Sequence, residues 1–213
     1  MSVDDYYLVQ HENGSSSVGC RQTGEVMHPI VGPEVEARSL YVDGLKLRER
    51  FGECDSLCIW DIGMGAAANA LTAAQALRDL TGKLRIISFD RTASALAFAR
   101  DHEARFGYLK DCRQSLDALL NEGRTTIELD GLLVDWVFRE GEFLDELAGD
   151  WPAPDAIFFD AWSPLKNPGM WTLQVFEQLH QRLGRPSSLA TYSRATCVRA
   201  ALLLAGFYVG QGR

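Results

Sequence analysis

Short apolar runs alternate with amphipathic stretches along most of the chain. The apolar runs predict strands at 57–62, 84–89, 127–134, 156–159, 188–192 and 207–209. Between them, apolar residues recur at helical spacing over 66–80, 93–105, 116–121, 142–147, 171–183 and 196–205. Strands that alternate with helices are typical of an α/β protein with a mostly parallel, doubly wound sheet that is covered on both faces. Ligands of such sheets bind beyond the carboxyl ends of the strands.

The N-terminal residues follow a different pattern. Two short segments, 7–10 and 16–21, flank Asn13-Gly14, a dipeptide that favours a tight hairpin turn. The stretch 34–51 carries several apolar residues at partly helical spacing. We therefore expect a small N-terminal cap of a β-hairpin and a helix over residues 1–50, followed by the main domain over residues 51–213.

The composition is that of an ordinary globular protein. The chain has 213 residues, of which 46% are hydrophobic and 23% charged, which excludes a disordered, collagen-like or coiled-coil protein. No apolar run reaches the roughly 18 residues of a membrane span, and residues 1–5 lack the features of a signal peptide, so we expect a cytoplasmic protein without a membrane partner. Five cysteines without a Cys-x-x-Cys pair predict neither disulfides nor a metal site, and Cys58 and Cys197 are expected to be small core residues.

Charge is distributed unevenly. The formal net charge is −8, which argues against a protein that coats nucleic acid by charge alone. From residue 160 onward, however, there are six cations (Lys166, Arg182, Arg185, Arg194, Arg199 and Arg213) and two anions (Asp160 and Glu177), a net of +4. This asymmetry indicates either an uneven solvated surface or an electropositive rim beside a site in the C-terminal half.

A glycine-rich turn follows the first predicted strand of the main domain. Gly63 and Gly65 let the backbone turn tightly and approach a ligand, and the helix that follows offers unpaired N–H groups. A dinucleotide fold requires G-x-G-x-x-G to hold a pyrophosphate, but residue 68 is Ala, and Asp61 would repel phosphate. S-adenosylmethionine carries an ammonium and a sulfonium and no phosphate, so an acid at position 61 suits it.

Two further acids follow predicted strands. Asp90 comes after the strand at 84–89 and can accept hydrogen bonds from both hydroxyls of a ribose. Asp135 comes after the predicted strand at 127–134 and can accept from an adenine amino group, unless it is a solvated strand end. Together with Asp61, these acids favour a methyltransferase over a dehydrogenase.

The densest candidate chemistry follows the strand at 156–159. This strand delivers Asp160 at its carboxyl end, and two prolines stiffen the loop that follows, so that Trp162 and Lys166 would face the ligand crevice. A strand-end carboxylate beside a positive sulfonium is a suitable place for a reacting group. The alternative is a stiffened turn whose tryptophans, Trp162 and Trp171, pack on the core.

A resemblance to a known family emerges over residues 155–209. The segments FFDAWSPLKNPGMWT, VFEQL, LATYS and VRAALLLAGF resemble the S-adenosylmethionine-dependent methyltransferase domain of the MnmC family, which acts in the biosynthesis of 5-methylaminomethyl-2-thiouridine in tRNA. Upstream, DIGMGAAANAL resembles the family's D-x-G-x-G-x-G-x-N loop, and ISFDR resembles its acid-ending second strand. The resemblance implies a Rossmann-like class I methyltransferase fold, S-adenosyl-L-methionine as the cofactor and tRNA as the partner.

The resemblance also implies roles for individual residues. It assigns cofactor binding to Asp61, Gly63, Gly65, Asn69 and Asp90, and it places Asp160 against the substrate amine and the methyl donor. The chain departs from the family where Ala67 replaces a third glycine and where Val134 replaces the usual glycine before Asp135. Bifunctional members of the family carry a following FAD-dependent oxidase domain, which is not found in this sequence, so we expect no flavin chemistry. The family's methyltransferase fold also has a seventh, antiparallel strand, and we expect a sheet without it here.

These observations lead to one hypothesis and two alternatives. The hypothesis is methyl transfer to the primary amine of 5-aminomethyl-2-thiouridine at the tRNA wobble position, with Asp160 orienting the amine. Trp162 would stack on the flipped-out base, and Lys166, Arg194 and Arg199 would contact phosphates. The first alternative is a methyltransferase of a small-molecule amine, which suits the charge of −8. The second is a catalytically silent binding module with the methyltransferase fold.

Overall fold

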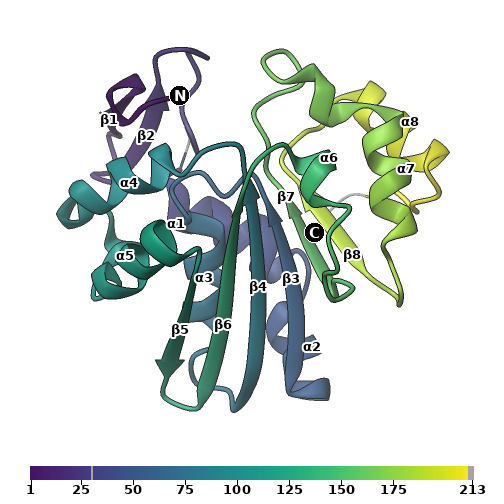
Figure 1. Cartoon of the computed structure of the whole chain (residues 1–213), viewed down its shortest axis with the longest axis horizontal. Coiled ribbons are helices and arrows are strands. Elements are labelled where there is room, and N and C mark those ends of the chain that lie inside the picture. Colours follow the sequence, from purple (N-terminus) through teal and green to yellow (C-terminus); the bar gives the residue numbers. More distant parts are fainter. Residues whose placement is uncertain (30, 211–213) are drawn as a thin grey trace.

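The computed structural model describes residues 1–29 and 31–210, and its centre is a six-stranded sheet with helices on both faces (Figure 1). In spatial order the strands are β5 (Arg124–Leu129), β6 (Leu132–Glu140), β4 (Gly82–Asp90), β3 (Ser56–Ile62), β7 (Ala156–Phe159) and β8 (Ser188–Thr191). The strands from β6 to β8 run parallel, and β5 pairs antiparallel with β6. The predicted mostly parallel α/β sheet is confirmed.

Each central strand contributes alternate residues to two hydrophobic clusters, one on each face of the sheet. In β3, Leu57 and Ile59 belong to the first cluster, and Cys58, Trp60 and Ile62 belong to the second. The first face packs against α1 (Pro33–Ala37), the π-helical turn η2 (Arg38–Asp43), α2 (Leu47–Cys54), α3 (Ala68–Leu77), α4 (Ser94–Asp101) and α5 (Arg113–Glu122). The second packs against α6 (Phe143–Glu146), α7 (Leu173–Gln181) and α8 (Thr196–Leu204). Short 3-10 turns are η1 (Val3–Asp5), η3 (Glu103–Arg105), η4 (Gly107–Leu109) and η5 (Pro168–Trp171).

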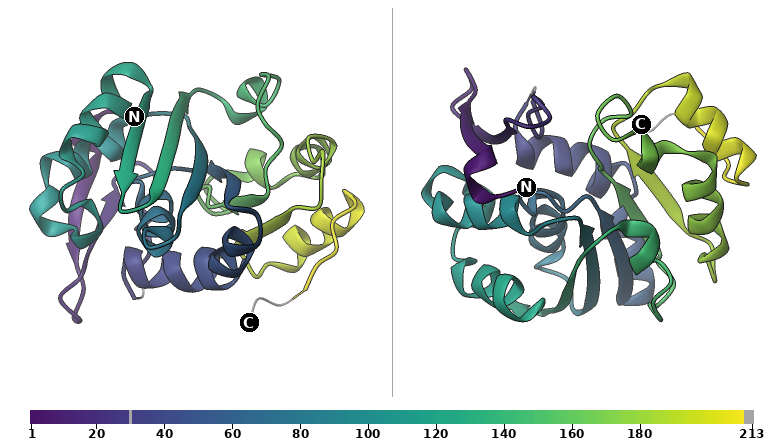
Figure 2. Two further views of the ribbon diagram at one scale, coloured as in Figure 1. Left: turned by 90° about the horizontal axis from the view of Figure 1, so that it is seen from below. Right: turned by 45° about the horizontal axis from the view of Figure 1, so that its top comes forward.

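The N-terminal segment forms the predicted hairpin and then crosses toward the ends of the sheet strands. The hairpin consists of β1 (Tyr6–Gln10) and β2 (Ser16–Cys20), which pair antiparallel. The chain then runs back along β2, because the Glu25 carbonyl accepts from the Cys20 N–H at 2.9 Å and the Met27 N–H donates to the Val18 carbonyl at 2.9 Å. In the right-hand view of Figure 2, this purple segment and the yellow C-terminal helix lie on opposite sides of the strand ends.

Several predicted elements were wrong. The run 127–134 is not one strand, because Asp130-Gly131 makes a two-residue hairpin turn between β5 and β6, with a left-handed φ of 51° at Asp130. Residues 207–210 lie outside any strand. Cys58 is buried as expected, whereas Cys197 is exposed on α8. The division at residue 50 and the lack of a seventh strand stay predictions.

The register of the parallel strands brings three acids to one edge of the sheet. Ile62 of β3 pairs with Phe159 of β7, and in β4 Phe89 pairs with the same Ile62. Asp61, Asp90 and Asp160 therefore lie within one residue of this row, at the carboxyl ends of three neighbouring strands. This is the edge at which open parallel sheets bind ligands.

Candidate active site

The turn between β3 and α3 brings the backbone against the end of β7. Gly63 and Gly65 have φ values of 87° and 53°, in the left-handed region that favours glycine. The Gly63 N–H donates to the Phe89 carbonyl at 2.8 Å. A Cβ at Gly63 would lie only 2.6 Å from the Asp160 carbonyl oxygen, so the close approach of these two segments requires glycine.

Asp90 is fixed by the same turn. Its Oδ2 accepts from the Gly65 N–H at 2.9 Å, and its Oδ1 accepts from the Thr92 N–H at 3.4 Å. Burial raises the pKa of Asp90, and these backbone hydrogen bonds act against that rise. The side chain lines the crevice beyond the strand ends, so its carboxylate oxygens can accept hydrogen bonds from a ligand there.

Asp61 is a fully buried acid behind the turn. Its Oδ2 accepts from the Ser88 hydroxyl at 2.7 Å, and that hydroxyl in turn accepts from the Trp136 indole at 2.9 Å. Its Oδ1 is buried and accepts no hydrogen bond from a described residue. Burial raises the pKa of Asp61 to about 7, with the nearby carboxylates acting in the same direction. Asp61 is not among the described residues that line the crevice, so its carboxylate lies behind the turn and not at the crevice wall.

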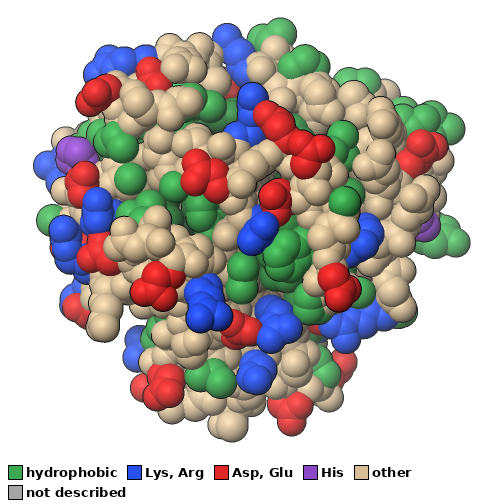
Figure 3. All heavy atoms as spheres, in the orientation of Figure 1, with side chains coloured by type: hydrophobic (Ala, Val, Ile, Leu, Met, Phe, Trp, Pro, Cys, Tyr) green, Lys and Arg blue, Asp and Glu red, His purple; other side chains and the backbone are tan. Residues whose placement is uncertain are grey.

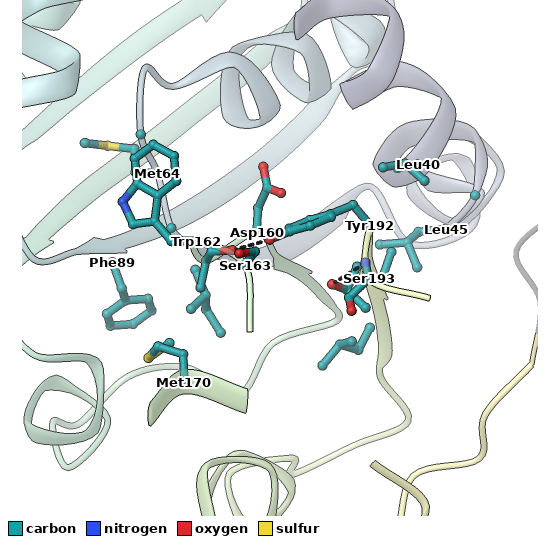
Figure 4. Close-up of a pocket in the computed structure, with 18 of the residues that line it drawn as sticks. Leu40, Leu45, Met64, Phe89, Asp160, Trp162, Ser163, Met170, Tyr192 and Ser193 are labelled. Atoms are coloured by element: carbon teal, nitrogen blue, oxygen red, sulfur yellow. Dashed lines mark hydrogen bonds between the residues drawn. The ribbon is translucent and has the colours of Figure 1, made fainter. Parts of the chain in front are cut away.

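Asp160 lies at the centre of a second group of polar side chains. Its Oδ2 accepts from the Asn69 amide at 2.7 Å, and the same oxygen lies 3.9 Å from His28 Nε2. Burial raises the pKa of Asp160, while His28, Asn69 and Tyr41 act in the opposite direction. Figure 4 shows the Asp160 side chain in the pocket, with Tyr192 and Ser193 on one side and Trp162 and Met64 on the other.

Buried polar atoms without partners gather around these two acids. Four of the six found in the described residues are His28 Nδ1, Tyr41 Oη, Asp61 Oδ1 and Asn69 Oδ1. Buried polar groups are normally satisfied, and unsatisfied ones require an explanation such as a ligand. Of these four residues only His28 lines the crevice, so only the His28 atom is placed to bond to a polar molecule bound there.

The loop after β7 is tied to the N-terminal segment. Ser163 donates to the Glu25 carboxylate through its N–H at 3.2 Å and also through its hydroxyl. Trp171 donates its indole N–H to the Trp162 carbonyl at 2.8 Å and packs in the second cluster, as the structural alternative predicted for Trp171. Trp162 is half-buried, packs against the first cluster as that alternative also predicted, and lines the crevice.

The predicted cations divide into two groups. Arg194 and Arg199 are exposed and line the same crevice, on its C-terminal side. Lys166 is exposed on the loop after β7 but does not line the crevice. Figure 3 shows positive and negative side chains interspersed over the face in view. This face therefore has no large area of a single charge.

The placement of Asp135 at a strand end was wrong. Because the turn at 130–131 starts a new strand, Asp135 lies near the beginning of β6, five residues before Glu140 and roughly 16 Å from the strand's carboxyl end. Its carboxylate pairs with Arg85 at 2.7 Å on the sheet surface. Asp135 does not line the crevice, so it is not a ligand for an adenine bound there.

The sequence reasoning missed the residues that the N-terminal segment supplies. Glu25, His28, Glu36 and Tyr41 all lie at the site, although the first fifty residues were interpreted only as a cap. A buried histidine between two acids has no local sequence signature, because its partners come from other elements. The described residues contain no cluster of three or more potential metal ligands and no helix long and apolar enough to cross a membrane.

Comparisons with known proteins find similar sequences. Residues 110–213 match the family described as S-adenosyl-L-methionine-dependent methyltransferase. The chain is 31% identical over 201 residues to the tRNA 5-methylaminomethyl-2-thiouridine biosynthesis bifunctional protein MnmC of Pseudomonas entomophila (strain L48), covering 88% of this chain and 30% of that protein. The corresponding protein of Burkholderia multivorans (strain ATCC 17616 / 249) is 27% identical over 193 residues, covering 86% and 29%. The chain thus spans less than a third of the length of these relatives.

A solved structure has the same fold. MNMC2 from Aquifex aeolicus superposes with a TM-score of 0.76 at 24% sequence identity, and the match covers 98% of this chain and 66% of that one. This similarity confirms the predicted Rossmann-like methyltransferase fold.

Proposed function

We propose that the chain, whose residues 110–213 match the family described as S-adenosyl-L-methionine-dependent methyltransferase, methylates the aminomethyl nitrogen of 5-aminomethyl-2-thiouridine at the wobble position of tRNA. The observation that carries the proposal is the buried carboxylate of Asp160, which lies at the end of β7 against the glycine turn and opens on the crevice. The relatives from Pseudomonas entomophila and Burkholderia multivorans support this choice of acceptor, because their names refer to the biosynthesis of 5-methylaminomethyl-2-thiouridine, the product of that methylation.

Three of the five predicted cofactor residues, Gly63, Gly65 and Asp90, line the crevice, and the carboxylate of Asp90 suits the hydroxyls of a ribose. Asp61, which is buried behind the turn and does not line the crevice, would favour a positively charged ligand through its charge alone. Gly63 and Gly65 line the crevice, and Gly63 lets the turn approach the end of β7 closely. Asn69, at the start of α3, holds Asp160. When it is bound, S-adenosyl-L-methionine supplies an electrophilic methyl group on a positively charged sulfur.

Asp160 is the proposed catalytic residue. A primary amine with a pKa like that of lysine, about 10, is protonated at neutral pH and must lose a proton before it can attack. Asp160 orients the amine by hydrogen bonding and accepts that proton. A carboxylate also stabilises the unreactive ammonium, and the Asn69 amide, which donates a hydrogen bond to Asp160, opposes this effect by sharing its negative charge.

The remaining candidates concern the RNA. Trp162, half-buried at the crevice, offers an aromatic face on which a flipped-out base can stack. Arg194 and Arg199 line the crevice and are exposed, so they are suited to phosphates; Lys166 would contact RNA only outside the crevice.

The test uses tRNA that carries 5-aminomethyl-2-thiouridine, labelled methyl donor and mass spectrometry of the nucleosides. We expect labelled 5-methylaminomethyl-2-thiouridine, and we expect Asp160→Asn to lower the single-turnover rate by about a hundredfold or more. Asp135→Asn is the matched control, because it makes the same chemical change at a carboxylate outside the crevice. Unchanged transfer by Asp160→Asn would disprove the role of Asp160.

Salt dependence distinguishes the alternatives. If three cations contact phosphates of single-stranded RNA, binding should weaken about twentyfold between 50 and 200 mM salt, from a logarithmic slope of about 0.7 for each contact. Transfer to a free amine that does not depend on salt would instead support a small-molecule methyltransferase. Cofactor binding without transfer to either acceptor would support a silent binding module.

A further inference from the structure

The N-terminal segment places a buried histidine between two acids from different elements. His28 Nε2 lies 3.9 Å from Asp160 Oδ2, and His28 Nδ1 lies 3.7 Å from Glu36 Oε1 on α1. The side chains of His28, Glu36 and Asp160 are 10%, 19% and 15% exposed, so this row of three groups is largely shielded from water. Charged interactions are stronger in such surroundings than on the surface.

The position of His28 is fixed by the hairpin. Its backbone has a left-handed φ of 53°, and its carbonyl accepts from the Ser17 hydroxyl at 3.2 Å. The preceding residue, Met27, bonds to β2 through its N–H, so the hairpin holds the segment in register. His28 therefore faces Asp160 because of the fold and not because of a freely rotating loop.

The acids around His28 stabilise its protonated ring. Glu36 faces it from α1, Asp160 from the end of β7 and Asp61 from β3, and the neutral phenol of Tyr41 lies on η2 beside the same acids. Burial lowers the pKa of His28, but Glu36 and Asp160 outweigh it, and the net change is upward. The upward change makes the neutral ring of His28 a stronger acceptor for a proton that reaches Asp160.

We propose that His28, oriented by Glu36, receives through Asp160 the proton that the substrate amine releases. The inference rests on the proposed function and adds a route for the proton. It assigns His28 as a positioning residue, since His28 acts on the substrate only through Asp160.

The step balances. One N–H bond of the ammonium breaks, and the nitrogen keeps the electron pair with which it forms its bond to the methyl carbon. The carbon–sulfur bond of the donor breaks, and the sulfur keeps that pair. The released proton passes to Asp160 and then to His28 Nε2, which lines the crevice and returns it to solvent. The 3.9 Å between Nε2 and Oδ2 exceeds a hydrogen bond, as is common before substrate binds and the contacts tighten.

The first test measures the histidine itself, without methyl transfer. Titration of ring-labelled histidine by NMR in the full chain should give His28 a pKa above the ordinary value of a histidine. Glu36→Gln should lower the pKa of His28. An unchanged pKa of His28 in this variant would overturn the proposal.

The second test measures single-turnover methyl transfer against pH. In the wild type, transfer should rise with pH through the titration of His28, because only the neutral ring accepts a proton. His28→Gln should lose this inflection and transfer about tenfold to a hundredfold more slowly at neutral pH, with cofactor affinity unchanged by calorimetry. His102→Gln is the control and should keep the wild-type profile.

Rescue separates a proton route from a merely structural role. Free imidazole should accelerate His28→Ala but not Asp160→Asn, since imidazole replaces the lost base and not the lost carboxylate. A wild-type pH profile in His28→Gln would overturn the proposal while leaving the function intact. A wild-type protein that methylates neither tRNA nor a free amine would overturn the proposed function, and the proton route with it.

Discussion

Asp61→Asn should stabilise the protein while weakening its site. The side chain is fully buried, its Oδ1 has no partner among the described residues, and its pKa is raised from 3.8 to about 7, chiefly by burial. An asparagine has the same shape and can still accept from Ser88, but it carries no charge to desolvate.

The sign and size follow from linkage. The Asp61 carboxyl keeps its proton up to about pH 7 in the folded state but loses it near pH 4 in the unfolded state. The resulting contribution to the free energy of unfolding is fully present below pH 4 and is lost as pH rises through about 7. A difference of three pKa units corresponds to at most about 4 kcal/mol. At pH 8 the Asn variant should therefore be more stable than the wild type by up to about 4 kcal/mol, and at pH 4 the two should be nearly equal.

Urea unfolding at several pH values between 4 and 8 measures this difference directly. Asp135→Asn serves as the control, because its ion pair with Arg85 is about 40% exposed and contributes about 1 kcal/mol at most. Calorimetry should find weaker binding of S-adenosyl-L-methionine to Asp61→Asn, by about ten- to a hundredfold. A stability difference that does not change with pH, or an Asn variant less stable at pH 8, would refute the reasoning.

Three further predictions concern the turn, the ribose acid and the RNA face. Gly63→Ala should destabilise the fold by about 2 kcal/mol more than Gly14→Ala in urea, since both glycines have φ above 80° but only Gly63 has backbone atoms within 3 Å of the added Cβ. Equal losses would contradict the close approach. Asp90→Asn should weaken cofactor binding about tenfold by calorimetry with little change in melting temperature. Trp162→Ala should weaken tRNA binding by about 1 to 3 kcal/mol in a filter assay and leave cofactor affinity unchanged.

The sequence was informative wherever a strand ended directly in its functional residue. Asp160 follows an apolar run whose bounds, 156–159, agree with the structure, and Gly63 and Gly65 follow another, so local periodicity located both. Asp135 shows the opposite case. The run 127–134 reads as one apolar strand, and the Asp130-Gly131 turn inside it, a strong hairpin signal, was overlooked.

The rest of the site depends on contacts between distant segments. His28 meets Asp160 across more than a hundred residues, and Glu25 meets Ser163 in the same way. Such pairs leave no periodic signal, because each partner sits in a pattern of its own. The exposed position of Cys197 has a related cause: α8 has only Val198 and Leu202 fully packed against the sheet, although its sequence is almost entirely apolar.

The N-terminal segment is better understood as part of the site than as a cap over it. Tyr41 packs against Phe158 of β7 with ring centroids 4.8 Å apart, and the hydrophobic cluster on that face of the sheet runs without interruption across residue 50. The same segment places His28 and Glu36 behind Asp160. A protein that began at residue 51 would therefore lose the proposed proton route and would also expose part of the hydrophobic core. Stability and chemistry at this end of the sheet thus depend on the same residues.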